Sequence, residues 1–442
     1  MTVVPLHKSR GSGLGSQQDT RSIIAVLDVG STKICCLIAE VVTLKNRVFG
    51  GERSHQLKLL GLGHQVARGT RLGAVVDMEE AERAIRLAVD AAERMAGHTV
   101  ENIYVNVSGG RPQCKGYKGH LHLGGREVGR ADISKVIRHA QGTVDTGPQR
   151  IVLHTTPTSF GLDDTRFIPN PEGMFGDALS VGLNAVSVDR GPMRNLAMVI
   201  ERCHLGIAGF VIAPYAAGRS VLVPDEMSMG VTCIDMGGGT TSISIFSEGQ
   251  LVYADAVPVG GHHITMDIAR GLSTPIAHAE RMKTLYGSAL PAVCDERELV
   301  SVPLVGEKGT DAVNKIPRSM LTGIIQPRLE ETFELVAARL KSSGLAHFAG
   351  RRVVLTGGGS QLNGARELAG TMLDRQVRFG YPQPITGMPE SARGPGFAVA
   401  AGLLNYAIEP DKATIAMPDI GSETAHEPNY LMRVGQWIRE SI

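Results

Sequence analysis

Apolar residues in this 442-residue chain follow two spacings, which predict where its strands and helices lie. Continuous or alternating apolar runs of roughly 4–8 residues predict buried strands, and apolar residues three or four positions apart predict amphipathic helices. The clearest strand pattern is at 231–246, where one apolar strand leads to Asp235 and glycines reverse the chain. The second strand of this predicted hairpin places Ile243 and Ile245 inward and Ser242 and Ser244 outward.

The turn of this hairpin has the chemistry of a phosphate site. Successive glycines allow several backbone N–H groups to converge on one anion, and a carboxylate at a strand end can hold hydrated Mg²⁺. An ordinary β-turn is the alternative interpretation of the stretch taken alone. The residues predicted to contact phosphate are Gly237, Gly238, Gly239 and Thr240.

A second hairpin of the same design lies near the N-terminus, at 23–40. One apolar strand leads to Asp28, which stands 207 positions before Asp235 (235 minus 28), and another apolar strand follows. This repetition predicts a duplicated fold with two facing lobes. The candidate phosphate contacts between the two strands are Gly30, Ser31, Thr32 and Lys33.

A third glycine segment follows a predicted strand at 353–356. Its glycines are Gly357, Gly358 and Gly359, and the apolar residues at helical spacing after them are Leu362, Ala365, Leu368 and Met372. The N-terminus of that helix would face the turn, and the positive end of a helix favours a phosphate. Three such segments together favour a nucleotide site over three unrelated turns.

This combination resembles the actin-like ATPase superfamily, which includes actin, sugar kinases and Hsp70. The resemblance implies two phosphate loops at 28–33 and 235–241 and an adenosine loop at 357–362, with ATP and Mg²⁺ as ligands. The chain has no GxxxxGK[ST] motif and no complete GxGxxG, so neither a P-loop nor a Rossmann site is favoured. The implied contacts are Glu280, Lys283, Gly357, Gly358, Gly359 and Leu362 for adenosine, and Asp28 and Asp235 for the metal.

The segment between the two phosphate loops narrows the resemblance. It contains predicted strands, a short helix at 132–141 and a Pro/Gly-rich turn, IPNPEGMFG. That turn resembles the NPxGMxG motif of the FtsA family of bacterial cell division proteins, in which a subdomain is inserted in the first lobe. NVSGG at 106–110, the turn at 154–157 and Asp163 match the same pattern. A loop shaped by Pro and Gly is the alternative for the turn alone.

The predicted fold class is therefore α/β: an actin-like (RNase H-like), two-lobed duplicated fold with an FtsA-type inserted subdomain and a C-terminal amphipathic helix. Helices are expected at 77–97, 193–206, 328–340 and 397–408. The predicted boundaries are a disordered tail at 1–21, first-lobe segments at 22–101, 185–217 and 386–408, the inserted subdomain at 102–184, the second lobe at 218–385 with a smaller subdomain at about 259–325, a linker at 409–428 and the terminal helix at 429–442.

One departure from the superfamily concerns hydrolysis. Hsp70-like relatives carry a Glu before a Pro at the place where this chain has Ala213 and Pro214. Positioning the attacking water is much of phosphoryl-transfer catalysis. We therefore expect nucleotide binding with at most weak ATPase activity, and no catalytic residue is predicted.

Composition limits the partners and the compartment. The net charge is +1 with basic and acidic residues nearly balanced, so no nucleic acid partner is expected. The six cysteines, including Cys35 and Cys36, show no zinc spacing and are typical of buried thiols in the cytoplasm. The first 21 residues lack an apolar signal core and no apolar run reaches about 18 residues, so neither a signal peptide nor a spanning helix is predicted.

The final segment, 429–442, predicts a helix that lies on a membrane surface. Two arginines are nearly cancelled by Glu440 and the terminal carboxylate, so apolar insertion would dominate over attraction to anionic lipid. One copy would bind weakly, and several copies in a polymer would gain avidity. A terminal helix packed on its own core is the alternative. The predicted membrane-binding residues are Tyr430, Leu431, Val434, Trp437, Ile438 and Ile442.

The resemblance to the FtsA family implies an ATP-binding protein that polymerises at the cytoplasmic face of the inner membrane at the division site. It implies that the second lobe binds the C-terminal tail of FtsZ, so that FtsZ filaments are anchored, and that later division proteins are recruited. Two alternatives keep the fold: a pilus-assembly adaptor resembling PilM, and an enzyme such as a sugar kinase or an Hsp70-like ATPase. A kinase would need a catalytic Asp in a sugar cleft, and a chaperone a large C-terminal substrate domain.

Overall fold

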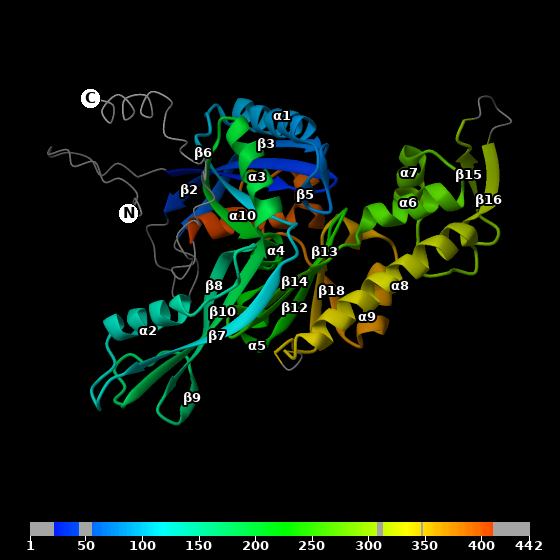
Figure 1. Cartoon of the computed structure of the whole chain (residues 1–442). Helices are drawn as coiled ribbons and strands as arrows, with labels where there is room; N and C mark the ends of the chain where they lie inside the picture. The colour runs from blue at the N-terminus through cyan, green and yellow to red at the C-terminus, as the bar shows by residue number, and fades with distance from the viewer. Residues whose placement is uncertain (1–21, 44–54, 307–312, 346–347, 410–442) are drawn as a thin grey trace, which may run out of the picture.

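Two five-stranded sheets with the same strand order form the two lobes (Figure 1). The structure, a computed structural model, describes residues 22–43, 55–306, 313–345 and 348–409. The first sheet has the order β3 (His55–Val66), β2 (Lys33–Thr43), β1 (Ser22–Val29), β6 (Asn102–Val107), β11 (Gly206–Ile212). The second has the order β14 (Gln250–Val257), β13 (Thr241–Ser247), β12 (Val231–Met236), β17 (Arg352–Thr356), β18 (Gln376–Phe379).

The strand directions are also the same in the two sheets. The first three strands of each order are antiparallel, and the last two run parallel to the third. Each hairpin places its aspartate one residue before the end of its first strand, Asp28 opposite Cys35 and Asp235 opposite Ser242. The duplicated, two-lobed fold predicted from the two hairpins is therefore confirmed.

The predicted alternation along the second strand of the hairpin at 231–246 was wrong in one respect. Ser242 and Ser244 are 5% and 0% exposed, so they do not face solvent. Helix α4 (Ala213–Val221) covers this face of the sheet, and Ser244 Oγ donates a hydrogen bond of 2.9 Å to the carbonyl of Pro214. A sheet covered on both faces hides polar residues that would be solvent-exposed in a half-covered one.

The helices of the first lobe begin and end at or near the residues that the sequence predicted. In α1 (Met78–Ala96) the Asp77 carboxylate accepts the N–H groups of Glu79 and Glu80, and Gly97 ends the helix with a φ of +67°. Helix α3 (Arg190–Arg202) begins and ends a few residues earlier than predicted. Helix α10 (Ala398–Ile408) matches the predicted return helix and packs against α4.

The second lobe departs more from prediction. The helix expected at 328–340 is α8 (Arg318–Ser342), which begins earlier and continues through Pro327, because Leu321, Ile325 and Leu329 extend its buried face. The predicted smaller subdomain at about 259–325 holds α6 (Gly261–Gly271) and α7 (Ile276–Tyr286) and also two strands, β15 (Leu299–Pro303) and β16 (Val313–Pro317). A short helix, α5 (Pro224–Met229), precedes β12.

The helix expected after the third glycine turn also begins later. A 3₁₀ turn, η2 (Gly358–Gln361), begins within the glycines, directly after Gly357, and Gly364 with a φ of +76° separates it from α9 (Ala365–Leu373). Leu362 therefore lies between the two elements. Gly358 and Gly359 are therefore the first residues of a 3₁₀ turn, and no α-helix begins directly after the glycines.

A separate four-stranded sheet lies between β6 and β11 in the chain (Figure 1). Its order is β7 (Gln113–His122), β10 (Ala178–Asp189), β8 (Arg150–Leu162), β9 (Thr165–Ile168), and α2 (Arg130–Gly142) packs on one face over a core of its own. The strands that the sequence predicted in this segment are present, and the predicted short helix is α2. Two short strands, β4 (Thr70–Arg71) and β5 (Ala74–Val75), precede α1.

Three further predictions concern the chain as a whole. The predicted tail, linker and terminal helix lie outside the described residues. Among the described helices, none is long and apolar enough to cross a membrane. All six cysteines are described and have free thiols; Cys35, Cys36 and Cys233 are buried as predicted, but Cys114 and Cys203 are half-buried and Cys294 is exposed.

Candidate functional site

The turns of the two hairpins have the same geometry and touch each other between the lobes. The N–H of Gly30 donates to the carbonyl of Lys33 (3.0 Å), and that of Gly237 donates to the carbonyl of Thr240 (2.9 Å). A Cβ atom on Gly238 would lie 2.3 Å from Cγ2 of Thr32. Side chains of the first turn thus occupy the space that the glycines of the second leave open.

A cavity of about 310 Å³ lies where the two turns meet. It brings together every phosphate and metal residue that the sequence predicted, along with two glycines of the third segment. The predicted residues that line it are Asp28, Gly30, Ser31, Thr32, Lys33, Asp235, Gly237, Gly238, Gly239, Thr240, Gly357 and Gly358. The others are Ser108, Ala213, Ser242, Pro395, Gly396, Phe397 and Val399.

Two buried carboxylates form one wall of this cavity. Asp28 is 7% and Asp235 9% exposed. Burial raises the pKa of Asp28 to about 6, against the lowering effect of the Lys33 ammonium. Burial and then the negative charge of Asp28 raise the pKa of Asp235 to about 7, and Lys33 again opposes the shift. Two like charges that line one cavity disfavour each other's ionisation, which a cation bound between them would relieve.

Asn106 holds one of these carboxylates in place. Its amide nitrogen donates to Oδ1 of Asp28 (2.8 Å), and its amide oxygen accepts the N–H of Val29 (2.6 Å). The asparagine is 1% exposed and comes from β6, the strand beside β1. The sequence placed Asn106 in a family motif but gave no sign of this contact, which depends on the parallel pairing of two strands distant in sequence.

The third glycine turn closes the cavity against Asp235. Gly357 has a φ of +85°, and a Cβ atom there would lie 2.3 Å from Oδ1 of Asp235. Its N–H donates to the carbonyl of Pro395 (3.2 Å). A side chain at Gly357 would therefore be strained and would displace the carboxylate.

A second cavity of about 460 Å³ adjoins the first and shares Thr32, Gly237, Gly238 and Gly358 with it. The remaining predicted residues line it: Glu280, Lys283, Gly359 and Leu362. The sequence analysis did not single out Arg318 or His262, which also line it. Arg318 stands at the start of a helix whose beginning was missed, so no pattern pointed to it.

Glu280 and Lys283 form an ion pair of 2.7 Å on α7. The Lys283 ammonium also donates to Thr265 Oγ1 (2.9 Å) and to the carbonyl of Gly261 (3.1 Å). Burial opposes ionisation of Glu280, but hydrogen bonds from Lys283 and Thr265 outweigh it and lower the pKa of the carboxyl. The pair thus ties α7 to α6 at the wall of the second cavity.

Ala213 lines the first cavity at the start of α4 and is 3% exposed. Its methyl group stands where the sequence comparison with Hsp70-like proteins led us to look for a carboxylate. A methyl group cannot accept a proton or orient a water molecule.

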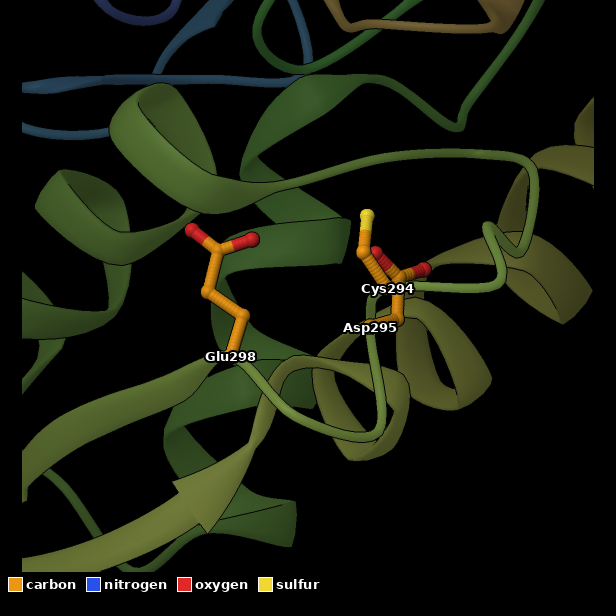
Figure 2. A group of neighbouring side chains, drawn as sticks. All are labelled: Cys294, Asp295 and Glu298. Carbon is orange, nitrogen blue, oxygen red and sulfur yellow. The ribbon is translucent and has the colours of Figure 1, made fainter.

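Cys294, Asp295 and Glu298 form a separate group of potential metal ligands in the turn before β15 (Figure 2), with ligand atoms within 4.8 Å of one another. The guanidinium of Arg318 lies 2.9 Å from Oε2 of Glu298 and 3.7 Å from Oδ1 of Asp295. It also donates to the carbonyl of Tyr286 (2.8 Å). Arg318 thus pairs with both carboxylates and ties this turn to the start of α8.

Comparison with known proteins decides the family. A family model of cell division protein FtsA matches residues 232–402, and a model of the SHS2 domain inserted in FtsA matches residues 109–187. A cell division protein FtsA of Rhizobium meliloti is 44% identical, over 95% of each chain. The chain belongs to the FtsA family of cell division proteins. FtsA membership confirms the resemblance found in the sequence and leaves the sugar-kinase, chaperone and pilus-adaptor alternatives without support.

Solved structures agree with the fold of this FtsA-family chain. The PilM-PilN type IV pilus biogenesis complex aligns with a TM-score of 0.59 at 16% identity, covering 88% of this chain and 99% of the other. MreB5 of Spiroplasma citri bound to ADP aligns with a TM-score of 0.51 at 14% identity, covering 89% of this chain and 100% of the other. At these identities the likeness shows the actin-like fold and nothing more.

Proposed function

We propose that this FtsA-family protein binds ATP with Mg²⁺ in the two adjoining cavities, and that the nucleotide controls its assembly into an actin-like polymer. The observation that supports this most directly is the convergence of two equivalent turns, each with a buried aspartate, on one cavity. Volumes of about 310 and 460 Å³ lie in the range of small-molecule sites.

The first cavity would hold the phosphates. The N–H groups of Gly30 and Gly237 close their own turns, so the donors proposed for phosphate are the N–H groups that follow in each turn, with the Lys33 ammonium. Asp28 and Asp235 fit Mg²⁺, which prefers oxygen ligands and few protein carboxylates. The metal would supply charge compensation between the phosphates and the two buried acids.

The second cavity would hold the adenosine. Glu280, Lys283, Gly359 and Leu362 line it next to the phosphate cavity, the order of parts in ATP. The ADP of the MreB5 structure supports a nucleotide in this fold. With a methyl group at Ala213, no side chain there positions water, so we propose slow hydrolysis, and ATP occupancy as the controlling state.

Family membership supports the cellular role that we propose. The polymer would lie at the cytoplasmic face of the inner membrane at the division site, where the second lobe would bind the C-terminal tail of FtsZ and the protein would help to recruit other division proteins. Membrane contact would come from the apolar face of 429–442, which lies outside the described residues. No nucleic acid partner is proposed, since the charge of the chain is balanced.

The test of nucleotide binding compares two glycine-to-aspartate variants of the full chain by calorimetry with Mg²⁺-ATP. Gly239→Asp would place a Cβ atom 2.5 Å from Ser31 Oγ and add a negative charge to the lining of the phosphate cavity, whereas Gly142→Asp, on the inserted subdomain, has no atom within 4 Å of the new Cβ. We expect the first variant to lose ATP affinity and the second to match the wild type. ATP affinity in folded Gly239→Asp equal to that of Gly142→Asp would contradict the proposal.

The cellular role has two tests of its own. Co-sedimentation with liposomes should be lost when residues 429–442 are removed and should rise with protein concentration as copies assemble. Unchanged sedimentation after removal would contradict the membrane role of that segment. Binding of an FtsZ C-terminal peptide should survive this truncation, and its loss would assign the partner to the terminus instead of the second lobe.

A further inference from the structure

The Lys33 side chain is held by the turn that precedes α10. The turn is η4 (Pro395–Phe397), closed by a hydrogen bond from the N–H of Phe397 to the carbonyl of Gly394 (3.0 Å). The Lys33 ammonium donates to the carbonyl of Gly396 (2.5 Å) and lies 3.4 Å from the centroid of the Phe397 ring. Both contacts come from residues that are 363 and 364 positions away (396 minus 33 and 397 minus 33), and no sequence pattern predicted them.

The same turn touches the second lobe. The carbonyl of Pro395 accepts the N–H of Gly357 (3.2 Å) and lies 3.5 Å from Oγ1 of Thr356. A Cβ atom on Gly396 would lie 3.8 Å from the Cα of Gly358, so the backbones of the two turns pass close to each other. The turn at 395–397 therefore connects the cation of the first phosphate loop to the third glycine segment.

The contacts around Lys33 preorganise its ammonium group for binding phosphate. An ammonium has three N–H donors, and the carbonyl of Gly396 takes one of them. An aromatic face attracts a cation without consuming a donor. The ring of Phe397 is steadied in turn by His64, whose ring meets it edge-on with the two centroids 6.2 Å apart. Lysine side chains lose much rotamer freedom when they bind, so a side chain already fixed binds phosphate at lower entropic cost.

We propose that Phe397 is a positioning residue for Lys33, holding its ammonium at the phosphate cavity so that a nucleotide polyphosphate meets an oriented cation. This inference rests on the proposed nucleotide function. Phe397 acts through Lys33 and not by its own contact with phosphate. Because the turn also binds the third glycine segment, a phosphate bound to Lys33 is linked to both lobes and to the start of α10.

The experiment measures Mg²⁺-ATP affinity of the full chain with Phe397→Leu, Phe397→Tyr and the same substitutions in a Lys33→Met background. Loss of a cation–ring contact should weaken ATP binding by roughly 2- to 30-fold in Phe397→Leu. Tyrosine keeps the aromatic face and should restore affinity. In the Lys33→Met background, Phe397→Leu should change affinity no further. Phe175→Leu, an exposed phenylalanine on the inserted subdomain, is the matched control and should leave affinity unchanged.

Other outcomes overturn the inference. A rise in affinity with Phe397→Leu would mean that the ring withholds Lys33 from the nucleotide. An equal loss with and without Lys33 would mean that Phe397 contributes packing alone.

A measurement without nucleotide separates this inference from the proposed function. Phe397→Leu should lower the urea midpoint less in the Lys33→Met background than in the presence of Lys33, since the pair is already broken there. If the wild type bound no ATP but this coupling were present, the proposed function would fail and the pairing would stand. Absence of the coupling would refute the positioning role whatever the ATP affinity.

Discussion

Gly402 in α10 packs directly against the backbone of α4, and replacing it with alanine should separate the two helices. A Cβ atom at this position would lie 1.7 Å from the carbonyl oxygen of Ala216 and 2.4 Å from its carbon. Ordinary van der Waals contact begins at 3.4 Å, which is twice the 1.7 Å found here, so the two backbones would have to move apart. Both helices are buried along most of their length and carry the chain between the lobes, so the movement would loosen the core that joins them.

The magnitude follows from two opposing effects. Overpacking a close-packed core costs about 1–3 kcal/mol and occasionally more, and the 1.7 Å approach to backbone atoms puts this site at the upper end. Alanine is favoured over glycine inside a helix by about 1 kcal/mol. We expect a net loss of about 2 kcal/mol in the free energy of unfolding for Gly402→Ala.

Gly323 in α8 supplies the matched control. It is also inside a helix, but it is exposed and an added Cβ would have no atom within 4 Å. Gly323→Ala should therefore stabilise the protein by about 0.5–1 kcal/mol. Urea unfolding of both variants, followed by circular dichroism, checks the pair. The reasoning fails if Gly402→Ala is as stable as the wild type, or if both substitutions shift stability in the same direction.

Three further predictions concern other sites. Gly238→Ala should lower the melting temperature by forcing its methyl group against Thr32, and adding Thr32→Ala should recover part of the loss, since that change removes the clashing atoms. Glu226→Gln should lower the free energy of unfolding by about 2 kcal/mol, because this 4%-exposed carboxylate pairs with two arginines that are themselves 35% and 52% exposed; the surface change Glu172→Gln should cost under about 1 kcal/mol. Burial lowers the pKa of His154 to about 4, so only the unfolded chain takes up a proton near pH 6.5 and stability falls as the pH falls through 6.5 toward 4. From pH 7 to 5 the free energy of unfolding of the wild type should fall by about 2 kcal/mol more than that of His154→Gln. Asp28 and Asp235 act in the opposite direction, but both proteins contain them, so their effect cancels in this comparison.

The parts of the site that the sequence predicted are those whose information is local. Each hairpin carries its aspartate, turn and flanking strands within about twenty residues, and helix α1 carries both of its end signals, Asp77 and Gly97. The duplication also made the position of the site predictable, because two equivalent turns on two equivalent sheets are expected to face one another. The convergence of Asp28 and Asp235 on one cavity follows from that symmetry.

The parts that were missed depend on contacts between distant segments. Asn106 reaches Asp28 because β6 pairs with β1, and Phe397 reaches Lys33 because α10, which follows it, packs on β1 and β2. The start of α8 was missed because Pro327 is a common helix start, and only the burial of Leu321 and Ile325 reveals that the helix continues past it. Burial from outside the segment also overturned the polar face assigned to Ser242.

The reason for the glycines in the second phosphate loop also differs from the one that the pattern suggested. Counting from the two aspartates, Ser31 and Thr32 occupy the places of Gly238 and Gly239, and both turns close with the same hydrogen bond, so this turn can form without glycine at these two places. Neither glycine has a positive φ. What excludes side chains at 238 and 239 is the facing lobe, where Thr32 and Ser31 would lie 2.3 and 2.5 Å from the new Cβ atoms. In the two duplicated loops, side chains on one lobe therefore require glycines on the other, and a substitution in either loop is best judged by what faces it across the cleft.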